Sequence, residues 1–242
     1  MHDAHCHFDL YPDPRAACAQ AAGMPAILVT TKPSAFQRAC ALAGDFPAIH
    51  PALGLIPQEA AALEAHLPLF LDLLPRARFV GEIGLDGVSP DPAVQAAQSR
   101  VFAAVLDACA KAGGKVLSIH SRRAATPVLD ALAAHGAAFP GAVILHWFSG
   151  NAAELVRATG MGCFFSVNPA MVKSANGRAL VRGMPRDRVV LESDGPFVEV
   201  DGRPAAPADG GLVVAHLAGL WGMSREAAEG LMDANFARAV GN

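Results

Sequence analysis

The sequence has little charge and no excess of basic residues. Only 17% of its 242 residues are Asp, Glu, Lys or Arg, whereas 52% are apolar. A disordered protein needs the opposite balance, because a chain with few apolar residues cannot offset its ordering entropy by burial. The 19 Lys and Arg residues stand against 22 Asp and Glu residues, which gives a formal net charge of −3. This balance excludes a protein that attracts nucleic acid or anionic membranes over its whole surface.

Cysteine pairs and long apolar runs are also missing. The five cysteines are scattered without a CxxC pair, which favours reduced thiols and a cytoplasmic protein. No apolar run reaches the ~18 residues that a bilayer-spanning helix needs. The first residues show no basic segment followed by an apolar one, so we expect no signal peptide. These absences argue against a secreted disulfide scaffold and against a membrane partner.

What the chain does contain is an alternation of short apolar runs with longer Ala- and Leu-rich stretches. Eight runs have the pattern of buried strands: residues 4–8, 26–30, 48–53, 79–84, 115–119, 142–146, 163–167 and 188–192. Helical stretches between them include residues 14–22, 59–74, 93–112 and 127–135. The pattern predicts an α/β fold, a single-domain (β/α)8 TIM barrel over residues 1–242. An open, doubly wound parallel sheet is the alternative.

Polar residues suited to chemistry stand where these predicted strands end. His5 and His7 are two apart on the first run, so both imidazoles are expected on the same side of the strand. Glu82 lies inside an otherwise apolar run, where a buried carboxylate needs a metal or a cationic partner. Three further candidates follow the fifth, sixth and eighth runs: His120, His146 and Asp194. Because the carboxyl ends of barrel strands share one mouth, we expect all six side chains to converge there.

These residue types predict a centre for one or two divalent metal ions. Imidazole nitrogens and carboxylate oxygens accept Zn²⁺, Mn²⁺ or Mg²⁺, so the sequence leaves the metal open. Glu82 is able to bridge two ions, and a bridged pair activates water and stabilises the leaving oxygen in hydrolysis. Asp194 is the natural general base for that water. Asp194 and Glu82 are therefore the candidate catalytic residues.

Six short motifs resemble the TatD-like metal-dependent hydrolases of the amidohydrolase superfamily. They are HCHFD at 5–9, GEIGLD at 81–86, IHSR at 119–122, HWFSG at 146–150, ESDGP at 192–196 and NF at 235–236. Their order and spacing run nearly end to end and are together highly specific. The resemblance implies a TIM barrel, a divalent-metal centre and deoxyribonuclease activity, often 3′→5′ exonucleolytic. It also implies one metal held by His5, His7, Glu82 and Asp194, and a second held by Glu82, His120 and His146.

The substrate implied by this resemblance is DNA ends or short single-stranded DNA. Four residues beside the motifs are candidate substrate contacts: Arg122, Arg123, Trp147 and Ser149. Arg122 suits a phosphate clamp or a structural ion pair, and Arg123 suits an anionic substrate or a surface salt bridge. Trp147 suits stacking on a base or packing beneath the sixth loop. Ser149 precedes a helix whose N-terminus suits an anion, or else Ser149 or Asn151 caps that helix.

Three positions depart from the family pattern and concern the substrate more than the metal. Ile56 replaces the histidine of a Gly-x-His-Pro stretch, Arg123 stands where an acidic residue is usual, and Gly87 stands where an aromatic residue is common. Two alternatives therefore stay open: a hydrolase of a small amide, ester or lactone, and a TatD-like component of a multi-protein antiphage defence system. Glu82 in the bridging position, instead of a carbamylated lysine, favours the nuclease.

Overall fold

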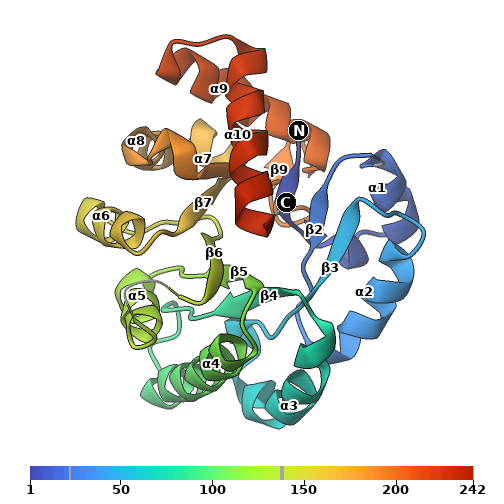
Figure 1. Ribbon diagram of the computed structural model, residues 1–242, viewed down its shortest axis with the longest axis vertical. Coiled ribbons are helices and arrows are strands. Elements are labelled where there is room, and N and C mark those ends of the chain that lie inside the picture. The colour runs from blue at the N-terminus through green and yellow to red at the C-terminus, as the bar shows by residue number, and fades with distance from the viewer. Residues whose placement is uncertain (22, 137–138, 242) are drawn as a thin grey trace.

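The computed structural model describes residues 1–21, 23–136 and 139–241. Its main element is a sheet of eight parallel strands in which each strand pairs with the next along the chain. The strands are β1 (Asp3–Cys6), β2 (Ala26–Leu28), β3 (Ile49–Leu53), β4 (Phe79–Gly84), β5 (Lys115–His120), β6 (Gly141–Leu145), β7 (Phe164–Val167) and β8 (Val189–Leu191). Figure 1 shows the strands at the centre and helices around them. The predicted eight-stranded barrel is confirmed.

The two edges of this sheet meet where β8 returns beside β1. The Asp194 N–H donates to the His5 carbonyl at 2.9 Å, and the His7 N–H donates to the Gly195 carbonyl at 2.8 Å. These bonds join the segments that leave the two edge strands. The sheet therefore forms a barrel, and the alternative of an open, doubly wound sheet is wrong.

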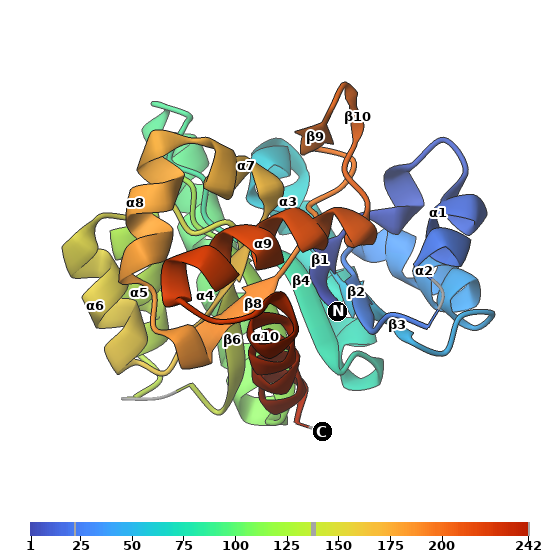
Figure 2. The same cartoon turned by 90° about the horizontal axis from the view of Figure 1, so that it is seen from above.

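Helices cover the outside of the barrel and fill the connections between strands. They are α1 (Pro14–Gln20), α2 (Phe36–Ala43), α3 (Ala60–Leu73), α4 (Pro92–Ala112), α5 (Ala125–Ala133), α6 (Ala152–Gly160), α7 (Pro169–Lys173), α8 (Ala175–Gly183), α9 (Gly210–Trp221) and α10 (Arg225–Val240). The helix predicted over 14–22 ends at Gln20, and Ala22 lies outside the described residues. After β8, a small hairpin of β9 (Glu199–Val200) and β10 (Arg203–Pro204) projects from the barrel (Figure 2).

Several helices begin at a side chain that accepts a hydrogen bond from the first turn. The Asp13 carboxylate accepts from the Ala16 N–H at the start of α1, and Asp91 does the same for α4. Asn151 and Glu154 form a capping box at the start of α6. Such caps satisfy N–H groups that have no partner within the helix, so they set where each helix begins.

The barrel interior has an apolar layer below the mouth. It consists of small, β-branched and aromatic side chains: Ala4, Ile27, Val29, Ala52, Phe79, Val116, Ile144, Phe164 and Val190. A larger apolar cluster fills the space between strands and helices, with Phe70 and Leu106 fully buried in it. Within the described part of the chain, no helix is both long enough and apolar enough to cross a membrane. The polar candidates all lie above the apolar layer, where the strands end.

Candidate metal centre

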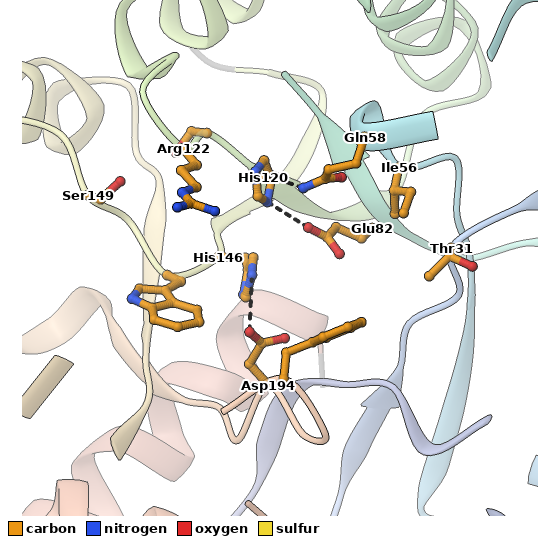
Figure 3. Close-up of a pocket in the computed structure, with 12 residues that line it drawn as sticks. Thr31, Ile56, Gln58, Glu82, His120, Arg122, His146, Ser149 and Asp194 are labelled. Carbon is orange, nitrogen blue, oxygen red and sulfur yellow. Dashed lines mark hydrogen bonds and ion pairs between the residues drawn. The ribbon is translucent and has the colours of Figure 1, made fainter. Parts of the chain in front are cut away.

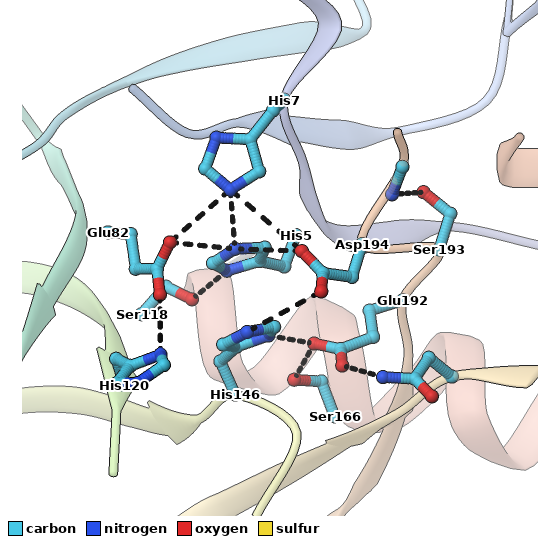
Figure 4. A network of polar contacts seen from close by, with 12 residues as sticks. His5, His7, Glu82, Ser118, His120, His146, Ser166, Glu192, Ser193 and Asp194 are labelled. Carbon is cyan, nitrogen blue, oxygen red and sulfur yellow. Dashed lines mark hydrogen bonds and ion pairs between the residues drawn. The ribbon is translucent and has the colours of Figure 1, made fainter. Parts of the chain in front are cut away.

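The six predicted side chains meet at the carboxyl-terminal mouth of the barrel. His5 lies in β1, Glu82 in β4, and His120 is the last residue of β5. His146 directly follows β6, and Asp194 is the third residue after β8. Figure 4 shows their imidazoles and carboxylates facing a common centre. Five of the six residues are buried, and His120 is half-buried.

His7 reaches this centre by a route that differs from the prediction. The strand predicted over 4–8 is too long, because β1 ends at Cys6 and a 3-10 turn begins at Phe8. The backbone of His7 has φ −91° and ψ 64°, which is outside the strand region. The Nε2 atoms of His5 and His7 nevertheless lie 3.3 Å apart. The two imidazoles converge, but strand alternation is not the reason.

An irregularity in β4 directs Glu82 into the barrel. The β4–β5 register shifts between Val80 and Ile83. A Cβ at Gly81 would lie only 2.8 Å from the Cβ of Ser118, so glycine is required for this close approach. A bulge of this kind re-aims a side chain, and here the side chain that it re-aims is the carboxylate.

The two oxygens of Glu82 face different histidines. Oε2 lies 3.3 Å from His7 Nε2 and 3.7 Å from His5 Nε2, whereas Oε1 lies 2.7 Å from His120 Nδ1. Burial alone would raise the pKa of Glu82, but its contacts with these three histidines outweigh burial and hold the pKa well below its usual range. Glu82 is therefore a charged carboxylate that connects two groups of imidazoles.

Asp194 lies opposite Glu82 in the same mouth. Its Oδ1 is 3.6 Å from His5 Nε2, and its Oδ2 is 3.9 Å from His146 Nε2. Burial raises the pKa of Asp194 to about 7. Burial and the charge of His146, whose ring stacks at 3.6 Å, lower the pKa of His5 to about 3. His5 is thus a neutral imidazole, which is the form that binds metals.

Three groups of donor atoms lie close enough together to share an ion. Atoms within 4.8 Å of one another come from His5, His7 and Asp194, from Glu82, His120 and His146, and from His5, His146 and Glu192. The first two groups belong to the two predicted metal sites, and Glu82 lies beside both. Buried imidazole nitrogens and carboxylate oxygens are donors that Zn²⁺ and Mn²⁺ accept. The residues present fit a divalent-metal centre.

A model of the family described as TatD-related DNase matches residues 2–241. The chain belongs to this family. The uncharacterized metal-dependent hydrolase YjjV of Escherichia coli is 30% identical over 85% of this chain and 83% of its own. Its crystal structure superposes with a TM-score of 0.88 at 25% identity, over 99% of this chain and 97% of that one.

Two further relatives carry nuclease names. Human deoxyribonuclease TATDN3 is 28% identical over 80% of this chain and 77% of its own. The 3′-5′ ssDNA/RNA exonuclease TatD of Cronobacter turicensis is 30% identical over 79% of this chain and 74% of its own. Membership confirms the sequence-based prediction of a metal-dependent hydrolase with nuclease chemistry.

Glu192 is a residue of this TatD-family centre that sequence reasoning missed. Its carboxylate lies 2.8 Å from His146 Nδ1 and accepts hydrogen bonds from Ser166 Oγ and, at 2.9 Å, from Asn168 Nδ2 (Figure 4). Burial alone would raise the pKa of Glu192, but His146 outweighs burial and lowers it. The available signal was similar to that of Glu82: an acidic residue within an apolar run, in this case its last residue.

On the opposite side of the mouth, Asp86 and Gln58 contact His120. The Asp86 Oδ2 atom lies 2.9 Å from His120 Nε2, and the Gln58 amide donates to Asp86 Oδ2 at 3.2 Å. Gln58 Nε2 is also 3.2 Å from His120 Nε2. Gln58 stands two residues after Ile56, and both line the same cavity, so the Gln58 amide supplies a polar group beside the apolar Ile56 side chain.

A cavity of about 610 Å³ opens over this centre (Figure 3). Three of the four predicted substrate contacts line it: Arg122, Trp147 and Ser149. Ser149 does not cap α6, because Asn151 holds that position. The wall also contains residues that the sequence did not indicate as contacts: Thr31, Ile56, Gln58, Ser121 and Phe197.

The fourth predicted contact, Arg123, is not among the residues that line the cavity. It is exposed, and its backbone adopts a left-handed φ of 53°. A Cβ at Gly87 would lie 2.2 Å from the Arg123 carbonyl oxygen. The loops after β4 and β5 therefore approach too closely for any side chain at position 87.

Two residues of the mouth have a strained backbone. Trp147 has φ 40° and Asp194 has φ 49°, in the left-handed region that costs a non-glycine residue of order 1–3 kcal/mol. Beside Asp194, a Cβ at Gly195 would lie 1.8 Å from the Tyr11 hydroxyl, so this turn is tightly packed. The surrounding structure holds the backbone of both residues in a conformation that the local sequence does not favour.

Proposed function

We propose that this protein is a divalent-metal-dependent deoxyribonuclease that removes nucleotides from the 3′ ends of short single-stranded DNA. The observation that carries the proposal is the convergence of four imidazoles and two carboxylates, four of which line one cavity. The naming of the Cronobacter turicensis relative as a 3′-5′ ssDNA/RNA exonuclease supports the polarity and the single-stranded substrate.

In this proposal His5, His7, Glu82 and Asp194 hold one ion, and Glu82, His120 and His146 hold the other. Zn²⁺, Mn²⁺ and Mg²⁺ are the candidate ions. A bound ion supplies Lewis acidity that polarises a phosphoryl oxygen and lowers the pKa of a water molecule. The donor atoms come from the carboxyl-terminal parts of five strands of a rigid barrel and the residues that follow them, so the protein orients them before substrate arrives.

Asp194 is the proposed proton acceptor. Its Oδ1 faces His5, whereas its Oδ2 lies at the His146 side of the mouth. Asp194 also lines the cavity, so a carboxylate oxygen is accessible to a water that attacks phosphorus. Glu192 is the proposed positioning residue for His146, because it contacts Nδ1 and leaves Nε2 directed at the centre.

The cavity wall supplies the proposed substrate contacts. The Arg122 guanidinium suits two oxygens of one phosphate, and the Ser149 hydroxyl suits a third. Trp147 and Phe197 are 37% and 61% exposed, which is unusual for large apolar side chains that line a polar site. Exposed aromatic rings suit stacking on unpaired bases, and such stacking is tolerant of sequence.

A nuclease assay with two labels tests this proposal. The purified protein is incubated with 3′-labelled and 5′-labelled single-stranded DNA, with and without a chelator, after its metal content is measured. We expect chelator-sensitive release of the 3′ label at the first cut, while the 5′-labelled strand shortens stepwise and keeps its label, and recovery when Zn²⁺, Mn²⁺ or Mg²⁺ is restored. Bound metal without any cleavage of DNA would instead favour the hydrolysis of a small amide or ester.

We also propose that the protein acts in the cytoplasm. All five cysteines are free, and four of them are buried. Reduced thiols of this kind are usual in that compartment. A fractionation experiment with an antibody to the native protein checks the location, and recovery in an oxidising compartment would contradict it.

A further inference from the structure

A second cavity lies at the opposite end of the barrel from the metal centre. Its volume is about 680 Å³. It is lined by Gly114 before β5, by the first residues of β6 and β7, and by the last residues of α10. Parallel strands all begin at the same end of a barrel, so this is the amino-terminal mouth. It shares no lining residue with the cavity over the metal centre.

Three arginines from separate segments line this second cavity. Arg78 directly precedes β4, Arg188 directly precedes β8, and Arg238 lies on α10. We call the cavity with these three side chains the basic mouth. Figure 1 shows α10 crossing the barrel near β6, and α10 packs against both β6 and β8. The chain therefore brings three cations to one place from positions that are far apart in sequence.

The partners that these arginines have among the described residues leave most of their charge uncompensated. Arg78 donates to the Val240 carbonyl, and Arg188 donates to the Gly162 carbonyl at 3.0 Å. Arg238 donates to the Asp187 carbonyl and to the Asn235 side chain. Among the described residues that line the cavity, Asp187 is the one acid, and its Oδ2 is 3.9 Å from Arg188 Nε.

Lys115 is a fourth cation in the basic mouth, but its ammonium group is already bound and is not free to contact a ligand. Its ammonium donates to the carbonyls of Leu74 and Ala77 at 3.0 and 2.6 Å. Burial and then the charge of Arg78 lower the pKa of the nearby His50, which is consistent with a positive potential at this end. The chain as a whole carries a net charge of −3, so the concentration of cations here is local.

Two of the guanidinium groups are held in position by aromatic rings. Arg78 Cζ lies 5.5 Å from the centroid of Phe79, and Arg188 Cζ lies 5.1 Å from the centroid of Phe164. Both rings belong to the buried apolar layer of the barrel. Cation–π contact with a fixed ring reduces the freedom that an arginine loses on binding a ligand. The arrangement is thus partly organised before any anion enters.

We propose that the basic mouth binds a small anion that carries one or more phosphate groups. Arginine forks match the oxygens of a phosphate and form two parallel hydrogen bonds with it. Three guanidinium groups around one cavity suit a diphosphate or the phosphate groups of a nucleotide, which share this chemistry. A long nucleic acid needs cations along a stripe, and here they surround a single cavity. This proposal does not depend on the proposed nuclease activity.

Calorimetric titration of the metal-loaded protein with pyrophosphate, and separately with ATP, tests the proposal. We expect Arg78→Gln and Arg188→Gln each to weaken binding at this site by about tenfold, because each removes charge-assisted hydrogen bonds. Arg188→Lys keeps the charge and is expected to lose less. Arg76→Gln is the matched control, since it removes an exposed cation two residues from Arg78 that does not line the cavity.

Phosphate groups also suit the opposite mouth, so Arg122→Gln is titrated in parallel. Binding that is lost with Arg78→Gln and Arg188→Gln, and retained with Arg76→Gln and Arg122→Gln, supports the proposal. Equal affinity in all variants, or a loss with Arg122→Gln alone, overturns it. A 20-nucleotide strand that binds through Arg78 and Arg188 tenfold more tightly than pyrophosphate also overturns it. Circular dichroism and thermal melting establish that each variant is folded.

Discussion

The mouth of the barrel that holds the metal centre and the apolar layer beneath it use the same strands for opposite purposes. In the apolar layer, side chains such as Ile144 and Val190 are fully buried and have no polar atoms to satisfy. In the mouth, His146 and Glu192 follow the same two strands, buried carboxylates face buried imidazoles, and Asp194 has a strained backbone. The apolar layer therefore stabilises the fold, and this stability offsets the cost of burying charged groups in the mouth.

The prediction with the largest expected effect concerns a substitution in the mouth that lowers activity much more than stability. Asp194→Asn keeps the shape of the side chain but removes the proposed proton acceptor and one metal donor. We expect hydrolysis to fall by about 10³-fold or more, while the free energy of unfolding changes by less than about 2 kcal/mol. A nuclease assay and urea denaturation of the same preparation measure both.

Asp201→Asn is the matched control, because Asp201 also has a left-handed φ, 52°, but is exposed and lies outside the cavity. It is expected to retain full activity. Full activity in Asp194→Asn would remove Asp194 from the mechanism.

The second prediction concerns the apolar layer, where a substitution is expected to lower stability much more than activity. Ile144→Ala deletes buried methyl groups from the barrel interior and is expected to lower the free energy of unfolding by about 2–5 kcal/mol. Activity per folded molecule is expected to stay within about twofold, since no polar contact of the mouth changes. Urea denaturation checks the stability. Val156→Ala, at a side chain that is 72% exposed, serves as the control.

A third prediction tests whether the contact between Glu192 and His146 positions the imidazole. Glu192→Gln keeps the size of the side chain but weakens its contact with His146 Nδ1. We expect metal affinity and kcat to fall by about 10–100-fold, with KM little changed. Metal titration followed by steady-state kinetics measures these values. Glu199→Gln in β9 removes an exposed carboxylate as a control. Unchanged metal affinity in Glu192→Gln would reduce Glu192 to a structural role.

The sequence was sufficient for the barrel and for the six residues of the mouth because each has a local signature. A buried strand appears as an apolar run, and a charged or imidazole side chain at its end is conspicuous. Parallel strands then bring the ends together, so His5 and Asp194 could be placed in one site although 189 positions separate them in the numbering.

The remaining parts of the site depend on which residues contact each other, and no local sequence pattern reports that pairing. The contact of Gln58 with His120 joins residues 62 positions apart, and that of Glu192 with His146 joins residues 46 positions apart. The end of β1 at Cys6 and the exclusion of Arg123 from the cavity depend on backbone angles that tertiary packing imposes. Propensity and periodicity do not report on such angles.

A fourth prediction concerns the exposed aromatic side chains of the cavity. Trp147→Ala and Phe197→Ala are each expected to raise KM for single-stranded DNA about five- to tenfold with little change in kcat, because stacking on a base contributes about 1–3 kcal/mol at most. Trp147→Phe keeps an aromatic face and is expected to recover most of the loss. Steady-state kinetics with a short oligonucleotide measures the effect. A fall in kcat alone would show that Trp147 acts on the metal centre instead.

The prediction with the smallest expected effect compares two buried histidines, His2 and His5, at opposite ends of the first segment of the chain. His5 directs Nε2 at the metal centre, whereas both nitrogens of His2 have structural partners: Nδ1 lies 2.6 Å from Asp233 Oδ1, and Nε2 accepts from the Leu191 N–H at 2.8 Å. Burial lowers the pKa of His2 below 6.5 despite Asp233. The unfolded chain therefore takes up this proton first as the pH falls.

The stability that neutral His2 contributes is complete above about pH 6.5 and is lost progressively below it, down to the folded pKa. One proton accounts for at most about 1.4 kcal/mol per pH unit. Guanidinium unfolding at pH 7.5, 6.5 and 5.5 is expected to show a shallower decline for His2→Gln than for the unmodified protein. Identical declines would mean that His2 takes up its proton at the same pH in the folded and unfolded chains, which would contradict the lowered pKa.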